Sequence, residues 1–490
     1  MSKSIMIQGT MSNAGKSLIT AALCRIFKQD GYSCAPFKSQ NMALNSFVTR
    51  EGLEMGRAQV VQAQAAGTEP SVLMNPILLK PTSDSGSQVI INGEAIGNMS
   101  ASEYYRRKRE FVPIVENAYK RLSESVDIVV IEGAGSPVEL NLSENDIVNM
   151  GMARIADAPV VLVGDIDRGG IFAQLLGTLS LLEPIDRERV KALIVNKFRG
   201  DKTLFKSGTE ILESRGGIRV AGVVPFLDCD IEDEDSLSEK LNKRRTGLVD
   251  IAVIRLPRIS NFTDFDVFSQ FSGVSVRYVS TADELKSPDL IILPGTKSTV
   301  SDMKFLRESG LEAAIIKANS PIFGICGGYQ LLGQQISDPE FSEGGGSIRA
   351  MGLLDTTTVF SSNKRLRQVH GKFNAISGFF GCLSGAEFDG YEIHLGRTEG
   401  NSHPLAVLNG NEPDGAFNKN VCGTYVHGIF DSKDVCERLV KALYKRSGLE
   451  YSGEVVEHEA YKQQQFDKLA EQVRECLDME LIYSIVNREV

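Results

Sequence analysis

Residues 323–330, Phe323-Gly324-Ile325-Cys326-Gly327-Gly328-Tyr329-Gln330, place a thiol on a glycine-bracketed turn directly after an apolar run. The run that ends at Phe323 predicts a buried strand, and a helix is predicted to begin near Gln330. Cys326 would then lie at a helix N-terminus, where the helix dipole favours a thiolate. The backbone N–H groups of Gly327 and Gly328 could hold an oxyanion there. A lone cysteine is more often an inert buried thiol, but the flanking glycines favour a nucleophile.

His427 is the candidate base for this thiol. It lies in Gly423-Thr424-Tyr425-Val426-His427-Gly428, which follows an apolar segment far along the chain from the cysteine. A nucleophile and a base that are distant in sequence can meet in the fold. We therefore predict that Cys326 and His427 form a catalytic pair.

Length and composition indicate a globular protein of two or three domains. The chain has 490 residues, of which 42% are hydrophobic and 24% are charged, and no stretch is apolar enough to span a bilayer. The N-terminus lacks the basic region, apolar core and cleavage site of a secretory signal, which predicts a cytoplasmic protein.

Cysteine content and net charge exclude further classes. The eight cysteines include no C-x-x-C pair, which argues against a disulfide framework and against a thiolate zinc site. The net charge of -10 disfavours nucleic acid and anionic membranes as partners. The cluster Arg106-Arg107-Lys108-Arg109 is too short to reverse that expectation and is interpreted as a solvated helix face.

Alternation of short apolar strands with helical stretches predicts an α/β protein with two doubly wound, mostly parallel-sheet domains and a C-terminal helical extension. The predicted strands lie at residues 4–7, 128–131, 160–163, 192–195, 251–254 and 290–293. The acidic and polar stretch after residue 228 indicates an interdomain linker. The predicted organisation is a synthetase domain at 1–235, a linker at 236–249, a second α/β domain at 250–447 and the extension at 448–490.

A phosphate-binding turn follows the first predicted strand. Gly9-Thr10-Met11-Ser12-Asn13-Ala14-Gly15-Lys16-Ser17 resembles a P-loop with one residue more than usual between its glycines, and this Gly-Thr opening is similar to that of dethiobiotin synthetase. The loop amides would cradle the phosphates of ATP, Lys16 would neutralise them, and the Ser17 hydroxyl would bind Mg²⁺. The residues predicted to bind the nucleotide are Thr10, Asn13, Ala14, Gly15, Lys16, Ser17, Asn196 and Lys197.

Other polar residues follow predicted strands and could serve the same site. Glu132, in Glu132-Gly133-Ala134-Gly135, would emerge at a strand's carboxyl end and could share Mg²⁺ with Ser17, although a structural glycine turn is the alternative. Further candidates, for binding the substrate, lie in loops after strands and could equally be exposed or turn residues. They are Lys38, Gln40, Asn41, Asp165 and Asp167.

A nucleotide-binding half beside a thiol-hydrolase half suggests that one site frees ammonia from glutamine and the other consumes it. Cys326 would attack the glutamine amide, His427 would protonate the departing ammonia, and ATP would activate a carboxylate, which is otherwise a poor acyl donor. The loop Leu293-Pro294-Gly295-Thr296-Lys297 resembles the oxyanion-strand loop of class I glutamine amidotransferases. That resemblance makes Gly295 the second candidate oxyanion donor beside Gly327.

The order of motifs resembles that of the cobyric acid synthases, glutamine-dependent amidases of the CobB/CobQ family, over essentially the full length. The matching segments are residues 8–17, 38–45, 79–81, 132–135, 165–170, 324–328, 391–394 and 425–428. The resemblance implies ATP-dependent amidation of carboxylates b, d, e and g of adenosylcobyrinic acid a,c-diamide, giving adenosylcobyric acid in adenosylcobalamin synthesis. Composition and spacing alone would not indicate a corrinoid.

One position departs from the general amidotransferase pattern. The usual Glu two residues beyond the catalytic His is replaced by Ile429, an absence that the resemblance implies is shared by the cobyric acid synthase branch. Asp431 and Glu392 are possible replacements, while His394 is expected to be a substrate or structural residue. Without an ionised partner for His427, thiolate formation would depend more on the helix end at Cys326.

Two rival functions remain open from the sequence. The first is a cobyrinic acid a,c-diamide synthase, which would use the same parts on other carboxylates. The second is a nucleotide-dependent switch ATPase with an inactive amidotransferase-like module. The motif order and the Ser39-Gln40-Asn41 run favour cobyric acid synthesis, whereas the order of amidations, the corrin-binding residues, the ammonia route and the oligomeric state stay undetermined.

Overall fold

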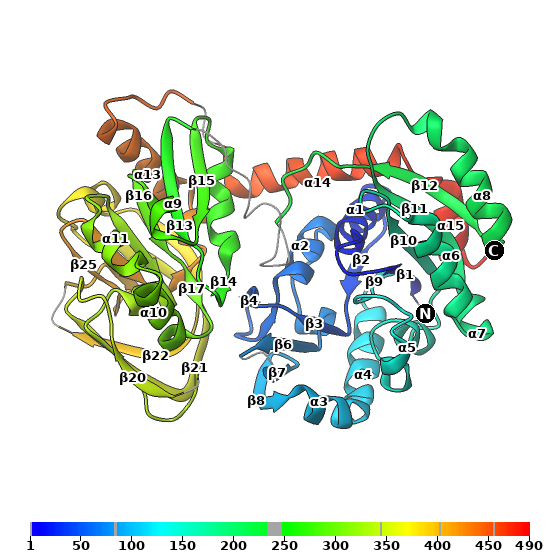
Figure 1. Ribbon diagram of the computed structural model, residues 1–490, viewed down its shortest axis with the longest axis horizontal. Coiled ribbons are helices and arrows are strands. Elements are labelled where there is room, and N and C mark those ends of the chain that lie inside the picture. Colours follow the sequence, from blue (N-terminus) through cyan, green and yellow to red (C-terminus); the bar gives the residue numbers. More distant parts are fainter. Residues whose placement is uncertain (1, 83–85, 233–246, 344, 401–402, 454–455) are drawn as a thin grey trace. The chain divides into compact units, whose positions relative to one another are not determined.

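The computed structural model of the chain describes residues 2–82, 86–232, 247–343, 345–400, 403–453 and 456–490 (Figure 1). It divides into two compact units. Unit 1 comprises Met1–Met42, Met55–Ile231 and Lys462–Val490, and unit 2 comprises Ala43–Glu54 and Glu232–Tyr461. Each unit is built on a mostly parallel sheet with helices, and helices occupy the C-terminal region, so the predicted fold class is confirmed.

Unit 1 has a fully parallel six-stranded sheet in the order β12-β11-β10-β1-β9-β2. Its strands carry near-continuous apolar runs because both faces are covered, as is typical of parallel sheets. Every residue of β9 and β10 is buried. The strands are β1 (Lys3–Gly9), β2 (Cys34–Phe37), β9 (Ile128–Glu132), β10 (Val160–Asp165), β11 (Val190–Phe198) and β12 (Arg219–Pro225).

Helices cover this sheet, and a smaller sheet is formed by the part of the chain between β2 and β9. The helices are α1 (Lys16–Gln29), α2 (Arg57–Ala66), α3 (Ala101–Arg107), α4 (Val112–Ser123), α5 (Met150–Ile155), α6 (Ile171–Leu181), α7 (Pro184–Arg187) and α8 (Lys206–Gly216). The small sheet has the order β3-β6-β7-β8, formed by β3 (Gln40–Met42), β6 (Ile77–Pro81), β7 (Gly86–Ile91) and β8 (Glu94–Ser100).

The C-terminal helices are α14 (His458–Arg474) and α15 (Met479–Asn487). Phe466 of α14 and Ile482 of α15 are buried in one apolar core with Ile26 of α1 and Ile5 of β1. The chain end from Lys462 onward therefore belongs to unit 1 rather than forming a separate extension.

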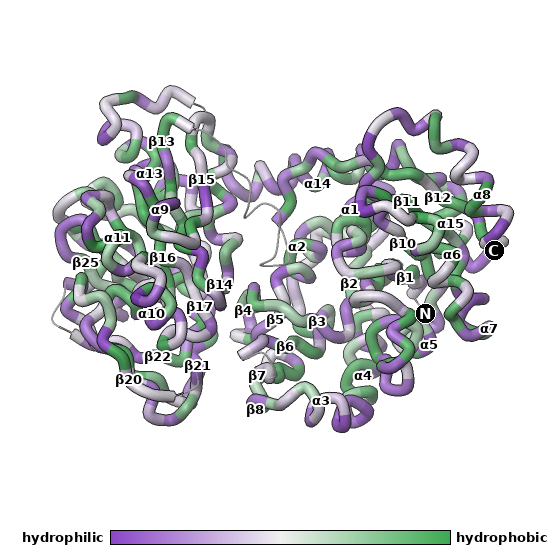
Figure 2. Tube along the Cα trace, viewed as in Figure 1, coloured by the Kyte–Doolittle hydropathy of each residue, from purple (hydrophilic) through white to green (hydrophobic). Residues whose placement is uncertain are grey.

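Unit 2 has a six-stranded sheet in the order β15-β13-β16-β18-β26-β25, parallel except for its last pair. Figure 2 shows the strands near its middle as largely hydrophobic, which agrees with their complete burial. The strands are β13 (Val249–Ile254), β15 (Val274–Val279), β16 (Leu290–Leu293), β18 (Ile322–Ile325), β25 (Ala416–Asn418) and β26 (Val421–Thr424). The helices of this unit are α9 (Ala282–Leu285), α10 (Thr299–Glu308), α11 (Leu311–Lys317), α12 (Gly327–Leu331) and α13 (Lys433–Arg446).

A second, mixed sheet of unit 2 is centred on two long antiparallel strands, β21 and β22. Its members are β19 (Gln335–Asp338), β20 (Gly346–Arg349), β21 (Thr356–Phe373), β22 (Glu387–Gly400), β23 (Ala406–Leu408), β24 (Glu412–Asp414) and β27 (Val426–His427). A short ladder joins β14 (Ile259–Ser260) to β17 (Gly295–Thr296), and another joins β4 (Ser46–Val48) to β5 (Glu54–Gly56).

The compact units differ from the predicted domains in two places. Residues 43–54, predicted to lie in the first domain, belong to unit 2 because they pack on β21 and β22. The predicted extension at 448–490 is split, with its end in unit 1. Most of the predicted linker at 236–249 lies outside the described residues, and β13 begins at Val249.

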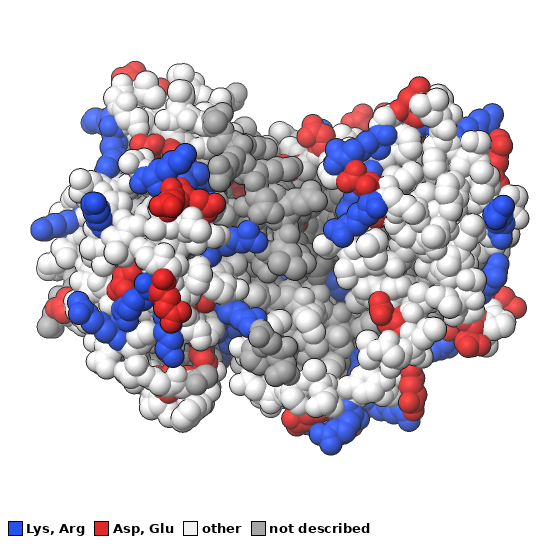
Figure 3. Space-filling view, viewed as in Figure 1, with Lys and Arg blue, Asp and Glu red and all other residues white. Residues whose placement is uncertain are grey.

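Acidic and basic side chains occur together on the surface. Figure 3 shows basic and acidic side chains interspersed over the visible face. Within the described ranges, no helix combines the length and apolar character needed to cross a membrane. The eight cysteines all lie in the described part of the chain, and each is free.

Candidate active sites

The nucleophile turn connects β18 to α12 through a strained Cys326. Its backbone has φ 51 and ψ -107, which a non-glycine residue rarely adopts and which suits a side chain presented on a sharp strand-to-helix turn. A Cβ at Gly324 would lie 2.8 Å from the Gly328 backbone, and one at Gly328 would lie 1.9 Å from the Leu293 carbonyl oxygen. Both positions therefore require glycine, which explains the glycines that bracket the cysteine.

Sheet topology brings His427 to the same edge as Cys326. Strands β18 and β26 are parallel neighbours, and the Cys326 amide donates to the Thr424 carbonyl oxygen at 2.8 Å. β27, which contains His427, follows β26 directly. Because the carboxyl ends of parallel strands meet at one edge, the predicted nucleophile and base lie together, and His427 is buried.

Asp264 supplies a third member of this site. Its Oδ2 lies 2.7 Å from His427 Nδ1, and its Oδ1 accepts from the Gly428 amide at 3.3 Å. Burial alone would lower the pKa of His427, but the Asp264 carboxylate and the neighbouring Cys326 outweigh it and raise that pKa to about 10. The raised pKa favours the imidazolium form, whose Nδ1–H would be directed at Asp264.

Sequence reasoning missed Asp264, which lies on the 3-10 helix η6 (Phe262–Gln270) rather than near His427 in sequence. Of the two proposed replacements, Asp431 lies 3.5 Å from His458 and Glu392 pairs with Arg367, whereas the carboxylate against His427 Nδ1 is that of Asp264. The signal available in the sequence was an acid within the phenylalanine-rich run of η6, because a buried carboxylate needs a partner.

Helix α12 contains only five residues. Its end is therefore a minor source of positive charge compared with the His427 imidazolium. The sequence predicted that thiolate formation would depend more on the helix end if His427 lacked an acidic partner, and the structure places Asp264 against His427.

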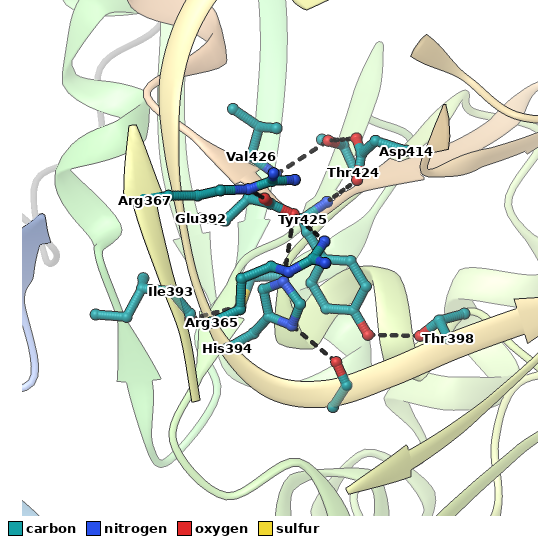
Figure 4. Close-up of polar contacts among 12 residues, drawn as sticks. Arg365, Arg367, Glu392, Ile393, His394, Thr398, Asp414, Thr424, Tyr425 and Val426 are labelled. Carbon is teal, nitrogen blue, oxygen red and sulfur yellow. Dashed lines mark hydrogen bonds and ion pairs between the residues drawn. The ribbon is translucent and has the colours of Figure 1, made fainter. Parts of the chain in front are cut away.

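The second histidine near the cysteine, His394, has a different environment (Figure 4). Its Nδ1 lies 2.7 Å from the Gly396 carbonyl oxygen, its Nε2 lies 3.4 Å from Glu392 Oε1, and its ring stacks on Tyr425 with centroids 3.7 Å apart. Glu392 is held in turn by Arg367. This cluster adjoins the nucleophile, because Cys326 Sγ lies 3.6 Å from the Ile393 carbonyl oxygen, but its histidine is fully engaged elsewhere.

The two predicted oxyanion glycines lie side by side. A Cβ on Gly327 would lie 2.6 Å from Thr296 Cγ2, and one on Gly295 would lie 3.0 Å from His427 Cε1. The loop that carries Gly295 is fixed by a hydrogen bond between Thr296 and Asp302 and by the Lys297 amide, which donates to Arg258 O at 3.0 Å. Only backbone fits at these two glycines.

The P-loop connects β1 to α1 and is held by two further residues predicted to bind the nucleotide, Asn196 and Lys197. Gly15 has φ 98, and a Cβ there would lie 2.0 Å from Asn196 Nδ2. Asn196 donates to the Ala14 carbonyl oxygen at 2.9 Å, and Lys197 Nζ donates to the Asn13 carbonyl oxygen at 2.6 Å. In this structure both residues therefore brace the loop.

Ser17 and Lys38 both contact the Glu132 carboxylate at the end of β9. Ser17 Oγ donates to Glu132 Oε1 at 2.8 Å, and Lys38 Nζ lies 2.9 Å from the same oxygen. Lys16 Nζ donates to the carbonyl oxygens of Met11 and Gly135 at 3.0 and 3.1 Å. Ser17 and Glu132 are thus placed together, as two Mg²⁺ ligands would have to be.

The remaining candidates contact other parts of unit 1. Thr10 Oγ1 donates to Gln174, a residue that sequence reasoning did not single out, at 3.1 Å. Asp165 pairs with Lys197 at 3.0 Å. The others pair with neighbours: Asp167 with Arg199, Gln40 with Tyr104 and Asn41 with Gln59.

Comparison with known proteins agrees with a nucleotide site in the N-terminal half of the chain and an amidotransferase site in the C-terminal half. Residues 5–238 match the family described as the CobQ/CobB/MinD/ParA nucleotide binding domain, and residues 250–435 match the CobB/CobQ-like glutamine amidotransferase domain. Cobyric acid synthase of Lachnoclostridium phytofermentans is 54% identical over 514 residues that cover 100% of both chains. That of Ruminiclostridium cellulolyticum is 55% identical, covering 100% of this chain and 98% of its own. That of Streptococcus sanguinis is 49% identical over 100% of both.

A nucleotide-binding domain joined to a glutamine amidotransferase domain defines the class of glutamine-dependent amidoligases. Within that class, the identity and coverage above place the chain in one family. It belongs to the cobyric acid synthases.

Proposed function

We propose that this chain amidates carboxylates b, d, e and g of adenosylcobyrinic acid a,c-diamide with ammonia from glutamine and at the expense of ATP, giving adenosylcobyric acid. Full-length identity to cobyric acid synthases supports the reaction. The observation that carries the proposal is the buried contact of His427 with Asp264 beside Cys326, which equips unit 2 for glutamine hydrolysis.

Glutamine hydrolysis begins with attack of Cys326 Sγ on the side-chain amide carbon. The oxygen of the tetrahedral adduct takes up negative charge, which the backbone N–H groups of Gly295 and Gly327 would stabilise. The C–N bond then breaks, and the His427 imidazolium gives its proton to the departing ammonia. Water hydrolyses the resulting thioester to glutamate, with His427 acting as the base, and Asp264 holds the imidazole in the required orientation.

Nucleotide binding falls to the P-loop of unit 1. Residues Asn13 to Ser17 would cradle the phosphates of ATP, and Asn196 and Lys197 would support that loop from β11. Ser17 and Glu132 offer a hydroxyl and a carboxylate for Mg²⁺, which supplies charge neutralisation when bound. Among the described residues, no cluster of three or more His, Cys, Asp or Glu is arranged to hold a metal ion.

Activation and amidation follow from the chemistry of carboxylates. Phosphorylation of a peripheral carboxylate by ATP converts a resonance-stabilised group into an acyl phosphate, and ammonia displaces phosphate to form the amide. Lys38, Gln40, Asn41, Asp165 and Asp167 stay candidates for contact with the acceptor. Lys38 is the best supported of these, because it shares Glu132 with the P-loop serine.

Incubation with adenosylcobyrinic acid a,c-diamide, ATP and glutamine tests the proposal through the mass of the product. Product should appear in steps of one amidation and end with b, d, e and g converted. Amidation of cobyrinic acid at a and c instead would indicate the rival diamide synthase, and nucleotide hydrolysis with no amide formed would indicate a switch ATPase. The predicted cytoplasmic location is a separate matter that cell fractionation tests.

A further inference from the structure

A short segment of the N-terminal sequence is built into unit 2 beside the catalytic histidine. Residues 43–54 leave unit 1 after β3 and return to it through β5, but their packing partners lie in unit 2. They follow directly on the Lys38-Ser39-Gln40-Asn41 run that the proposed function places near the acceptor.

Three buried residues form a closed ring of hydrogen bonds between this segment and the rest of unit 2. The Ser46 amide donates to Asn261 Oδ1 at 3.1 Å, and Asn261 Nδ2 donates to the Tyr391 hydroxyl oxygen at 3.1 Å. That hydroxyl donates in turn to the Ser46 carbonyl oxygen at 3.2 Å. Each member is at most 4% exposed, so the ring is shielded from water. Such a fully satisfied buried network holds its members in one arrangement.

The two side chains of this hydrogen-bond ring, Tyr391 and Asn261, lie next to the elements that carry His427 and Asp264. Tyr391 of β22 is the register partner of His427 in β27, and the two rings stack with centroids 5.5 Å apart and 22° between planes. Asn261 immediately precedes η6, the 3-10 helix that carries Asp264, and adopts φ 51 there. The hydrogen-bond ring therefore joins the start of η6, which carries Asp264, to β22, the strand that pairs with β27 and His427.

Apolar and ionic contacts fix the same segment. Val48 is fully buried with Tyr391 and Ile393, and Phe47 packs edge-on against Tyr391 with centroids 5.2 Å apart. Glu54 at the end of the segment forms a buried ion pair with Lys364 of β21. The segment is thus attached to the long β21–β22 ribbon by packing as well as by hydrogen bonds.

We propose that residues 43–54 are a positioning element of the glutaminase site. By bonding Asn261 and Tyr391, the segment sets η6 and β22 so that Asp264 and His427 align with Cys326. This role rests on the proposed glutamine hydrolysis and assigns Tyr391 and Asn261 as positioning residues. It also makes the rate of hydrolysis depend on residues that continue directly from the proposed acceptor site.

Tyr391→Phe tests the proposal most cleanly, because it removes the hydrogen bonds of the hydroxyl group and keeps the aromatic ring. We expect kcat for glutamine hydrolysis to fall about three- to tenfold, the loss expected for about one net hydrogen bond. KM for glutamine and amidation driven by free ammonia should stay within about twofold of wild type. Asn261→Gly, which keeps the positive φ accessible and removes both amide bonds, should give a larger fall in kcat.

Tyr444→Phe is the matched control, because Tyr444 also donates its hydroxyl to a backbone carbonyl, that of Ser272, at 2.7 Å. It should leave glutaminase kcat unchanged. The rate of Cys326 alkylation by iodoacetamide, corrected by a Cys326→Ala background, gives a reading independent of turnover. Tyr391→Phe should slow alkylation, whereas equal alkylation and equal kcat in Tyr391→Phe, Asn261→Gly and wild type would overturn the positioning role. If wild type hydrolyses no glutamine, the proposed function fails, and alkylation still decides the role of the segment.

Discussion

The P-loop of unit 1 and the nucleophile turn of unit 2 have the same plan, a buried parallel strand, a glycine-containing turn and a helix. They differ in where their chemistry comes from. The P-loop contributes contiguous backbone and side chains from residues 9–17, with Asn196 and Lys197 as braces. In the proposed mechanism, the nucleophile turn contributes one thiol, and charge and proton transfer come from His427 and Asp264, which lie on separate elements. A local motif therefore defines the loop at the centre of the first site, whereas the second site depends on residues that are distant in sequence from its turn.

The largest effect that separates the two sites is expected for Asp264→Asn. An amide can donate to His427 Nδ1 and favour the wrong tautomer, so glutamine hydrolysis should fall about a hundred- to ten-thousandfold. Amidation with free ammonia should be spared, because it does not use the thiol. Asp431→Asn is the control, and its partly exposed carboxylate should matter little. A normal glutaminase rate in Asp264→Asn would show that the second site needs no third residue.

Lys16→Ala tests the nucleotide site at the P-loop. Loss of the cation that neutralises nucleotide phosphates should lower amidation from both glutamine and ammonia about a hundred- to a thousandfold. Lys120→Ala, on the exposed face of α4, should have no effect and serves as the control. Steady-state rates with each nitrogen source make the comparison. Loss of only the glutamine-driven reaction in Lys16→Ala would contradict the assignment of nucleotide use to unit 1.

A smaller effect is expected for Gly295→Ala. The new methyl group would lie 3.0 Å from His427 Cε1 and 3.1 Å from the Ser260 carbonyl oxygen, so the loop or the imidazole must move. We expect glutaminase kcat to fall about tenfold, with the ammonia-driven reaction unchanged. Gly177→Ala, at a helical glycine with open space around it, is the control. Unchanged glutaminase kinetics would remove Gly295 from the oxyanion site.

The smallest difference between the two sites is expected in the pH dependence of their reactions. His427 has its pKa raised to about 10, so the imidazolium that protonates departing ammonia persists below that pH and is lost above it. kcat/KM for glutamine should therefore hold through the mildly alkaline range and fall near pH 10. In Asp264→Asn the fall should move to lower pH, since the carboxylate that favours the charged imidazole is gone. A fall near the ordinary histidine pKa in wild type would contradict this electrostatic account.

Buried parallel strands were predictable, because a strand that is covered on both faces appears in the sequence as a continuous apolar run. The predicted runs at 128–131 and 290–293 correspond closely to β9 (Ile128–Glu132) and β16 (Leu290–Leu293). The small sheet and the mixed sheet were not predicted. Strand β8, whose residues are mostly exposed, shows why, because it offers no apolar run to recognise.

Site residues divide in the same way. Lys16, Ser17, Cys326 and His427 follow strands, where glycine and polar residues mark functional turns. Asp264 was hidden because its role depends on the tertiary placement of η6, and the replacement of the usual Glu by Ile429 gave no indication of where its substitute lay. The membership of residues 43–54 in unit 2 also arises from tertiary packing, since no feature of that segment alone indicates it.

Glutamine-driven and ammonia-driven amidation by Cys326→Ala test most directly the claim that one unit frees nitrogen and the other consumes it. The variant should release no glutamate and form no amide from glutamine, while it amidates the corrinoid at the wild-type rate when ammonia is supplied. Amide formation from glutamine in this variant, or loss of the ammonia-driven reaction in a folded protein, would contradict that claim.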